Sequence, residues 1–138
     1  MKNALEALTP QIEAAIATAL RQNLMTNRGT FAPFRVGSTA KAIINAIVHQ
    51  SLDEIEALGQ SLSRDGLSLA SLIAAQTATL RVVAETTAPG ALIVPLTSAF
   101  GALITGQSKA YIDEIRGQFD EMERAFRKVI AEQQEFRR

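Results

Sequence analysis

The side chains that could carry out chemistry are few and scattered in this sequence. It contains no cysteine, which excludes disulfides, thiolate metal ligands and cysteine nucleophiles. His49 is the only imidazole, and as a haem or metal ligand it would need an open pocket and a hydrogen-bond acceptor behind it. It lies at the end of a predicted helix, where a histidine also interacts favourably with the helix dipole. We therefore expect His49 to be a structural or surface residue.

Carboxylates occur in three clusters along the chain. Neighbouring residues on a helix point in different directions, so adjacent acids do not form the carboxylate pair that acid–base catalysis requires. The clusters are Asp53, Glu54 and Glu56, then Asp113 and Glu114, then Asp120, Glu121 and Glu123. The sequence also lacks a Glu-x-x-His metal motif, a Gly-x-Ser-x-Gly elbow, a phosphate loop and a dinucleotide fingerprint. We expect no enzyme activity, no catalytic or metal-ligating residues and no bound cofactor.

Arg81 is the only basic residue between Arg64 and Lys109, and it lies in an apolar helix four residues before Glu85. One interpretation is an exposed arginine paired with Glu85, a contact worth ~0.5 kcal/mol or less. The other is an anion anchor inside a ligand cavity, to which Gln76, Thr77 and Thr79 could add polar groups. We favour the exposed pair, because buried Thr and Gln side chains also bond to their own helix backbone.

The composition indicates a soluble helical domain. The chain is 47% hydrophobic and 20% charged, with zero net charge, so it is neither disordered nor suited to binding nucleic acid. The N-terminus lacks the basic and apolar regions of a signal peptide. The most apolar run, residues 91–105, is shorter than the ~20 residues that span a bilayer. We expect a cytoplasmic protein that binds neither nucleic acid nor a membrane.

Helical periodicity, caps and breaks divide the chain into four or five helices. We expect helices over residues 3–25, from 38 or 39 to about 50, from 52 to 64, over 68–86, and from 91 to the end of the sequence. Thr9-Pro10 could begin a separate piece within the first helix, and a kink or a true break could separate the second helix from the third. Ser51 and Glu54 form a predicted capping box, and Gly66 fits the left-handed position that ends a helix. The fold class is therefore all-α.

The same periodicity predicts which side chains face the core. In the third and fourth helices these are Leu52, Ile55, Leu58, Leu62, Leu69, Leu72, Ile73, Gln76, Leu80 and Val83. Phe31 and Phe34, in the loop before the second helix, are expected to seal one end of a bundle.

The end of the sequence carries the clearest pattern. Eight residues occupy the a and d positions of an unbroken heptad repeat, and all but one of them are apolar. They are Ile112, Ile115, Phe119, Met122, Phe126, Val129, Gln133 and Phe136. Residues 109–138 also hold 14 of the 28 charged residues, seven of each sign.

Two interpretations of this repeat are open. The stripe could pack along its own bundle, or the helix could leave the body and pair with a second copy. We favour the second, with residues 1–108 as a helical body and residues 109–138 as a linker towards a further domain. Gly101, Gly106 and Gly117 are expected to soften the helix where it leaves the body.

The order of elements resembles the N-terminal sensor domain of RsbR-type stressosome proteins. The resemblance rests on "RDGLSLASLIAAQTATLRVV" from Arg64 to Val83 and on a long last helix ending "AFRKVIAEQQEFRR". It implies a globin-like bundle without haem that dimerises and leads into an anti-sigma-factor-antagonist (STAS) domain. His49, on an early helix, is consistent with a globin fold that lacks haem. The resemblance implies no catalytic residues in this domain.

We therefore predict a bacterial cytoplasmic signal-input domain of a stress-response regulator. It would form a homodimer through its last helix and transmit a change to a downstream STAS domain and stressosome partners. One alternative is a globin-like domain that binds haem, a bilin or a lipid-like molecule in its apolar body. Another is a structural oligomerisation module that carries no signal.

Overall fold

The chain folds into five α-helices, of which the last is much longer than the others. A computed structural model describes residues 2–86 and 89–136, and no strand occurs among them. The helices are α1 (Lys2–Gln22), α2 (Val36–His49), α3 (Leu52–Arg64), α4 (Leu69–Ala84) and α5 (Gly90–Phe136). Two short 3₁₀ turns, η1 (Leu24–Thr26) and η2 (Pro33–Arg35), lie in the loop between α1 and α2. The prediction of an all-helical chain with a long C-terminal helix is confirmed.

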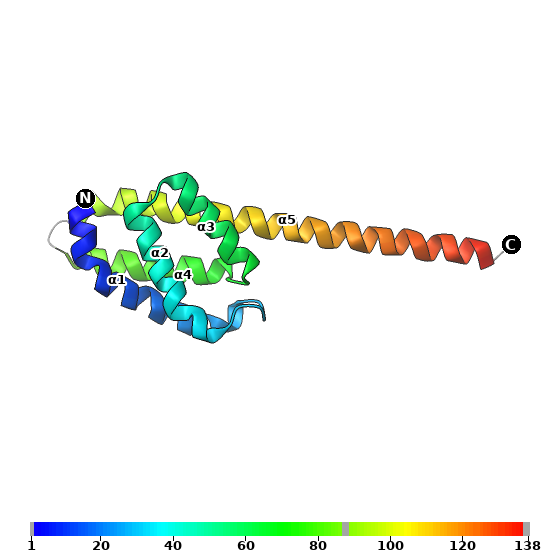
Figure 1. Ribbon diagram of the computed structural model, residues 1–138, viewed down its shortest axis with the longest axis horizontal. Coiled ribbons are helices and arrows are strands. Elements are labelled where there is room, and N and C mark those ends of the chain that lie inside the picture. Colours follow the sequence, from blue (N-terminus) through cyan, green and yellow to red (C-terminus); the bar gives the residue numbers. More distant parts are fainter. Residues whose placement is uncertain (1, 87–88, 137–138) are drawn as a thin grey trace.

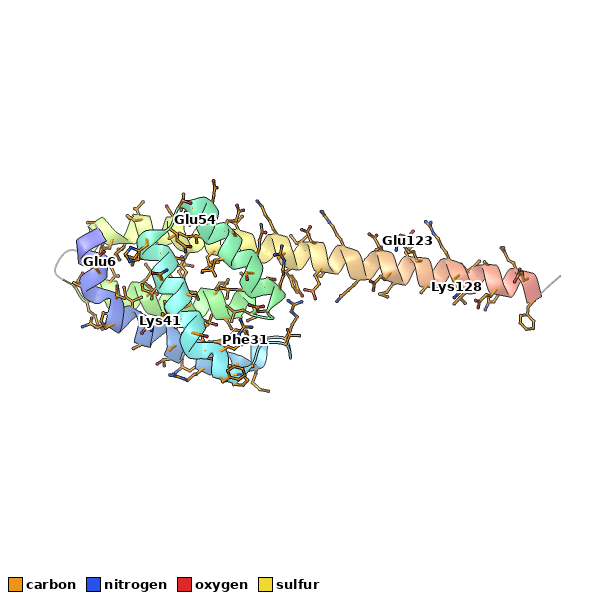
Figure 2. All side chains as sticks on the ribbon, viewed as in Figure 1. Glu6, Phe31, Lys41, Glu54, Glu123 and Lys128 are labelled. Atoms are coloured by element: carbon orange, nitrogen blue, oxygen red, sulfur yellow. The ribbon has the colours of Figure 1, made fainter. Side chains whose placement is uncertain are left out.

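The molecule has a body and a rod. Figure 1 shows α3 and α4 beside the N-terminal half of α5, with α1 on the far side of α4, while the orange and red half of α5 continues alone away from them. Side chains of the body point inward as well as outward, whereas those of the rod radiate from it on all sides (Figure 2).

The first helix is continuous through Pro10. The prediction that a separate helix begins at Thr9-Pro10 is therefore wrong. Figure 1 nevertheless shows α1 changing direction within its N-terminal turns. Proline bends a helix because it removes one backbone hydrogen bond. Thr9 does not cap a helix here, since its hydroxyl donates to the carbonyl of Leu5 at 3.0 Å. The helix ends at Gln22 and not at Met25, because the chain tightens into the 3₁₀ turn η1.

The second and third helices are separate, which decides a question that the sequence left open. Gln50 and Ser51 have extended backbone conformations between them. The predicted capping box is confirmed: the Glu54 N–H donates to the Ser51 hydroxyl at 3.2 Å, and the Ser51 N–H donates to the Glu54 carboxylate at 3.5 Å. Gly66 has a positive φ of 104°, as expected for the residue that ends α3. Helix α2 begins at Val36, two or three residues earlier than predicted.

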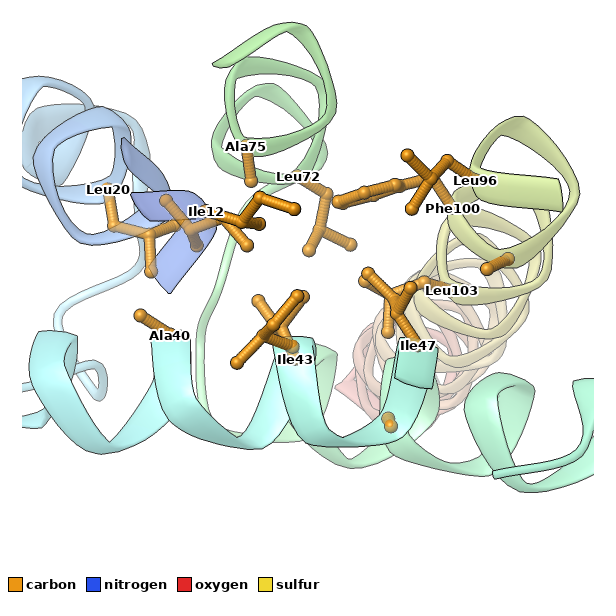
Figure 3. Close-up of a cluster of buried hydrophobic side chains, with 14 of the residues drawn as sticks. Ile12, Leu20, Ala40, Ile43, Ile47, Leu72, Ala75, Leu96, Phe100 and Leu103 are labelled. Atoms are coloured by element: carbon orange, nitrogen blue, oxygen red, sulfur yellow. The ribbon is translucent and has the colours of Figure 1, made fainter. Parts of the chain in front are cut away.

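The core lies between α1, α2, α4 and the first half of α5. Figure 3 shows Ile12 and Leu20 from α1, Ile43 from α2, Leu72 from α4 and Phe100 from α5 meeting in one cluster. These side chains are buried almost completely. The remaining buried apolar side chains of α5 that complete this cluster are Leu92, Leu96, Ala99 and Leu103.

Several side chains predicted to face the core do not. Leu52 in α3 and Leu69 and Ile73 in α4 are exposed, whereas Ser71 and Thr79 are buried instead. Their hydroxyls are satisfied locally: Thr79 donates to the carbonyl of Ala75 at 2.8 Å, and Ser71 donates to the side-chain oxygen of Asn27 at 2.8 Å. The core-facing side of α4 therefore combines Leu72 and Val83 with small residues and leaves Leu69 and Ile73 exposed.

The two loop phenylalanines have different environments. Phe31 is buried, as expected of a residue that seals the bundle, and the Arg35 guanidinium lies 5.9 Å from its ring centre. Phe34 is 87% exposed, so the prediction that it also seals the bundle is wrong.

Helices α3 and α5 cross at two glycines. A Cβ atom added to Gly59 would lie less than 3.0 Å from the carbonyl oxygen of Leu103, and one added to Gly106 would lie equally close to that of Glu56. Only glycine allows the two backbones to approach this closely. Gly106 is thus a packing residue at a tight crossing, and the expectation that it softens α5 is wrong.

Candidate functional site

The clearest feature of the surface is the part of α5 that leaves the body. Every residue from Tyr111 to Phe136 is exposed, whereas the preceding stretch of α5 contains buried residues up to Gln107. At about 1.5 Å per residue, these exposed turns extend for roughly 39 Å. We call residues 111–136 the exposed segment.

All eight heptad residues lie in the exposed segment and are exposed. We call them the apolar stripe: Ile112, Ile115, Phe119, Met122, Phe126, Val129, Gln133 and Phe136. Phe136, at the end of the stripe, is the most accessible at 95%, and Phe119, Met122 and Phe126 in its middle are 66%, 70% and 65% exposed. The interpretation that the stripe packs along its own bundle does not hold, because no body helix covers it.

The other faces of the exposed segment are charged. Arg127 and Glu123 form an ion pair at 2.6 Å, four residues apart on one helical face. Such a pair supports an isolated helix by only about 0.2–0.5 kcal/mol. The segment is therefore an amphipathic helix whose apolar side has no partner within the chain.

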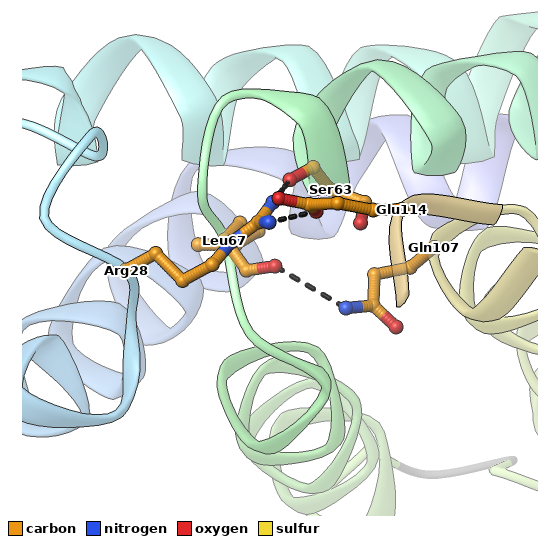
Figure 4. A network of polar contacts seen from close by, with 5 residues as sticks. All are labelled: Arg28, Ser63, Leu67, Gln107 and Glu114. Atoms are coloured by element: carbon orange, nitrogen blue, oxygen red, sulfur yellow. Dashed lines mark hydrogen bonds and ion pairs between the residues drawn. The ribbon is translucent and has the colours of Figure 1, made fainter. Parts of the chain in front are cut away.

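A set of polar contacts holds α5 where it leaves the body (Figure 4). Arg28, from the loop after η1, forms an ion pair with Glu114 of α5 and donates to the backbone carbonyl of Ser63 at the end of α3. The Arg28 backbone N–H donates to the carbonyl of Gly66 at 2.9 Å. One residue thus joins the loop, the end of α3 and the start of the exposed segment.

Two further contacts lie beside Arg28. The buried Gln107 side chain donates from Nε2 to the carbonyl of Leu67 at 3.3 Å, which ties α5 to the turn between α3 and α4. The Lys109 amine lies 2.6 Å from the carboxylate of Glu56 in α3. The hydrogen bond that Lys109 donates to Glu56, and then the negative charge of that carboxylate, raise the pKa of Lys109 above its ordinary value.

A pocket of about 440 Å³ opens at the same place. We call it the neck pocket. Its walls come from the loop after η1, the start of α4 and the middle of α5, and most of its lining is apolar. The lining residues are Thr26, Arg28, Gly66, Leu67, Ser68, Leu69, Ala70, Gln107, Ser108, Tyr111 and Ile112.

The other residues singled out from the sequence lie away from the neck pocket. His49 is exposed at the end of α2. Arg81 and Glu85 are both exposed, and no ion pair joins them in the part of the chain that the structure describes. Thr77 and Thr79 donate to their own helix backbone, as the favoured interpretation predicted. Residues 2–86 and 89–136 contain no group of three or more His, Asp or Glu placed to hold a metal ion.

Sequence reasoning missed Arg28 and Gln107. Arg28 lies in a loop, so no periodicity places it near α5, and its partner Glu114 is 86 positions away. Gln107 stands out in the sequence as a lone amide in the apolar half of α5. Its partner could not be predicted, because every residue has a backbone carbonyl and the sequence does not indicate which one accepts.

Helix α5 also bears on where the protein is located. Among the described residues, it is the one helix long and apolar enough to cross a membrane. The apolar run of residues 91–105 looked too short, but the helix continues beyond it, so its length does not exclude a membrane span. The buried residues Leu92, Leu96, Phe100 and Leu103 pack in the body, as in the core helix of a soluble protein.

Comparisons of the chain with models of protein families, with curated protein sequences and with solved structures found no match.

Proposed function

We propose that this chain is a bacterial cytoplasmic signal-input domain that forms a homodimer through the apolar stripe of α5. The observation that supports this proposal is the unpartnered stripe on a helix that is otherwise exposed on every side. Burial of a large apolar side chain is worth about 1.5–3 kcal/mol, so such a stripe favours association. A heptad spacing suits pairing with another helix.

A second copy is the partner that the stripe suits best. In a parallel pair the a and d residues meet their own counterparts, so Gln133 faces Gln133 of the other chain. Each amide can then bond to the other. In an antiparallel pair that overlaps residues 112–136 completely, Gln133 would face Ile115, and its amide would be buried without a partner. The single polar position therefore favours the parallel arrangement, in which both bodies lie at the same end.

The proposed direction of signalling runs from the body along α5. A change in the packing of α3 or of the loop containing Arg28 would alter the contacts that hold Glu114 and Lys109. A paired helix would carry that change towards a downstream STAS domain. The globin-like character of the bundle and its relation to RsbR-type stressosome regulators belong to this proposal. They rest on the order of the helices and on the absence of histidine from the later ones. The cytoplasmic location rests on the burial of the apolar side of α5 in the body.

The proposal is tested by the substitution Phe126→Glu. It removes a stripe side chain from both copies and places two carboxylates opposite each other. We expect the dissociation constant of the dimer to rise at least ~1,000-fold, which corresponds to about 4 kcal/mol. Size-exclusion chromatography with light scattering at 1–100 μM protein would show a dimer for the wild type and a folded monomer for the variant.

The matched control is Ala131→Glu. It adds the same charge to the same helix, but position 131 faces away from the stripe. The control should remain a dimer. A monomeric wild type at 100 μM, or a Phe126→Glu variant that remains dimeric at micromolar concentration, would contradict the proposal.

A domain that binds a small ligand is the second candidate function. The neck pocket, which touches both the body and the exposed segment, is the observation that favours it.

A further inference from the structure

We infer that the neck pocket binds a small organic monoanion: a carboxylate on an apolar body that also carries a hydrogen-bond donor. Pockets of about 300–1,000 Å³ are typical of small-molecule sites, and the neck pocket, at about 440 Å³, lies within that range. Leu67, Leu69, Tyr111 and Ile112 supply apolar walls for the body of such a ligand.

The charge of the pocket selects an anion. Arg28 is the one charged residue among those that line it, and no carboxylate faces it from the lining. The α4 helix also begins here. The first N–H groups of a helix have no acceptor within the helix, and the Ser68 side chain caps only that of Ser71. The backbone N–H groups of Leu69 and Ala70 therefore have no acceptor among the described residues. Free N–H groups and a guanidinium together favour a carboxylate.

Gln107 offers the pocket a hydrogen-bond acceptor. Its side chain is only 4% exposed and lines the pocket. Its Nε2 donates to Leu67, but nothing in residues 2–86 and 89–136 donates to its Oε1 (Figure 4). This oxygen is not among the buried atoms that lack a partner, so it is accessible, and a hydroxyl or N–H on the ligand would find an acceptor there.

The anion would compete with Glu114 for Arg28. The guanidinium is already paired with Glu114, so a bound carboxylate would share or replace that partner. Removal of the Glu114 charge should therefore strengthen binding, whereas removal of the Arg28 charge should weaken it. This pair of opposite effects distinguishes the neck pocket from non-specific binding on the apolar stripe. Loss of the Arg28–Glu114 pair would also loosen the attachment of α5 to the body. This consequence rests on the proposed signalling function.

The experiment uses 4-hydroxyphenylacetate as the probe and isothermal titration calorimetry as the measurement. Two matched compounds show how much the carboxylate and the hydroxyl of the probe each contribute to binding. 4-Hydroxyphenylacetamide lacks the charge, and phenylacetate lacks the hydroxyl. We expect a dissociation constant below 1 mM for the probe, on the scale of a small ligand making one charged contact. We expect binding at least ~10-fold weaker for the neutral amide and several-fold weaker for phenylacetate.

Four variants locate the site. Arg28→Gln should weaken binding of the probe at least ~10-fold, and Glu114→Gln should strengthen it ~3-fold or more. Gln107→Leu should remove the preference for the probe over phenylacetate. Arg35→Gln is the control, because Arg35 is also a loop arginine in an ion pair, with Asp65 at 3.0 Å, but does not line the pocket. It should leave binding unchanged.

The outcomes separate this inference from the proposed dimer. Absence of binding at 10 mM probe, equal binding of the neutral amide, or equal effects of the Arg28 and Arg35 variants would overturn the inference and leave the dimer untouched. The same titration on the Phe126→Glu variant should give the same affinity as the wild type. Loss of binding in that folded variant would mean that the probe occupies the stripe interface, which would also overturn the inference.

Discussion

At the scale of single residues, two ion pairs hold α5 where it leaves the body. Arg28 joins it to the loop after η1, and Lys109 joins it to α3. Both pairs are partly exposed, so each adds little to the stability of the fold. Their effect is on position: they fix the rotation of α5 at the last turn that the body still contacts.

The raised pKa of Lys109 predicts how the second contact depends on pH. The folded-state pKa lies above the ordinary value of 10.5, because Glu56 bonds to the charged amine and attracts it. The stabilisation is therefore complete below about pH 10.5 and is lost as the pH rises through the folded-state pKa. Thermal unfolding should show that Glu56→Gln lowers the melting temperature at pH 8 and has no effect well above the folded-state pKa. An equal effect at both pH values would contradict this assignment.

Single residues were predicted well where their role is local. Ser51 and Glu54 cap α3, and Gly66 ends it, because these motifs depend on neighbours within a few positions. Roles that depend on distant partners were not predictable. Gly106 looked like a flexible point, since its neighbour across the helix crossing, Glu56, is 50 positions away in the sequence.

At the scale of elements, the crossing of α3 and α5 is the tightest contact in the body. Gly106→Ala would push a methyl group into the carbonyl of Glu56, and backbone atoms cannot rotate away as a side chain can. We expect a loss of about 3 kcal/mol in the free energy of unfolding, measured by urea denaturation.

Gly101→Ala is the matched control on the same helix. Nothing lies within 4 Å of a Cβ atom at Gly101, so alanine there should stabilise the protein by about 0.5–1 kcal/mol. If both variants were stabilised alike, the close approach of α3 and α5 would be wrong.

The elements themselves were largely predictable from periodicity, caps and breaks. The burial of α4 was not. Apolar spacing pointed to Leu69 and Ile73, but Ser71, Ala75 and Thr79 face the core because small side chains allow α1 and α5 to approach. Periodicity measures hydrophobicity, whereas close packing of helices also depends on size.

At the scale of the whole molecule, the exposed segment has few contacts to keep it helical. Isolated helices of this length are marginal in water, so most of its stability must come from a partner. In the monomeric Phe126→Glu variant we expect amide hydrogens from about residue 115 to 136 to exchange within seconds to minutes. In the wild-type dimer they should be protected at least ~100-fold. Equal exchange in the two proteins, measured by mass spectrometry of peptides, would show that pairing does not stabilise the segment.

The separation into body and exposed segment followed from the heptad repeat and the concentration of charge after residue 108, both visible in the sequence. The packing of α3 and α4 against α5, and the neck pocket beside them, could not be predicted. They depend on how four helices are arranged in space, which local patterns do not encode.

The tight crossing at Gly59 and Gly106 acts as a fulcrum for the rest of α5. About 45 Å of helix separates Gly106 from Phe136, at about 1.5 Å per residue. A tilt of about 5° at the crossing would move the far end by roughly 4 Å, about three quarters of the rise of one helical turn. The two backbones are in close contact at the crossing, so a substitution or a ligand can shift it by a few tenths of an ångström. The displacement at the far end of α5 would then be several times larger.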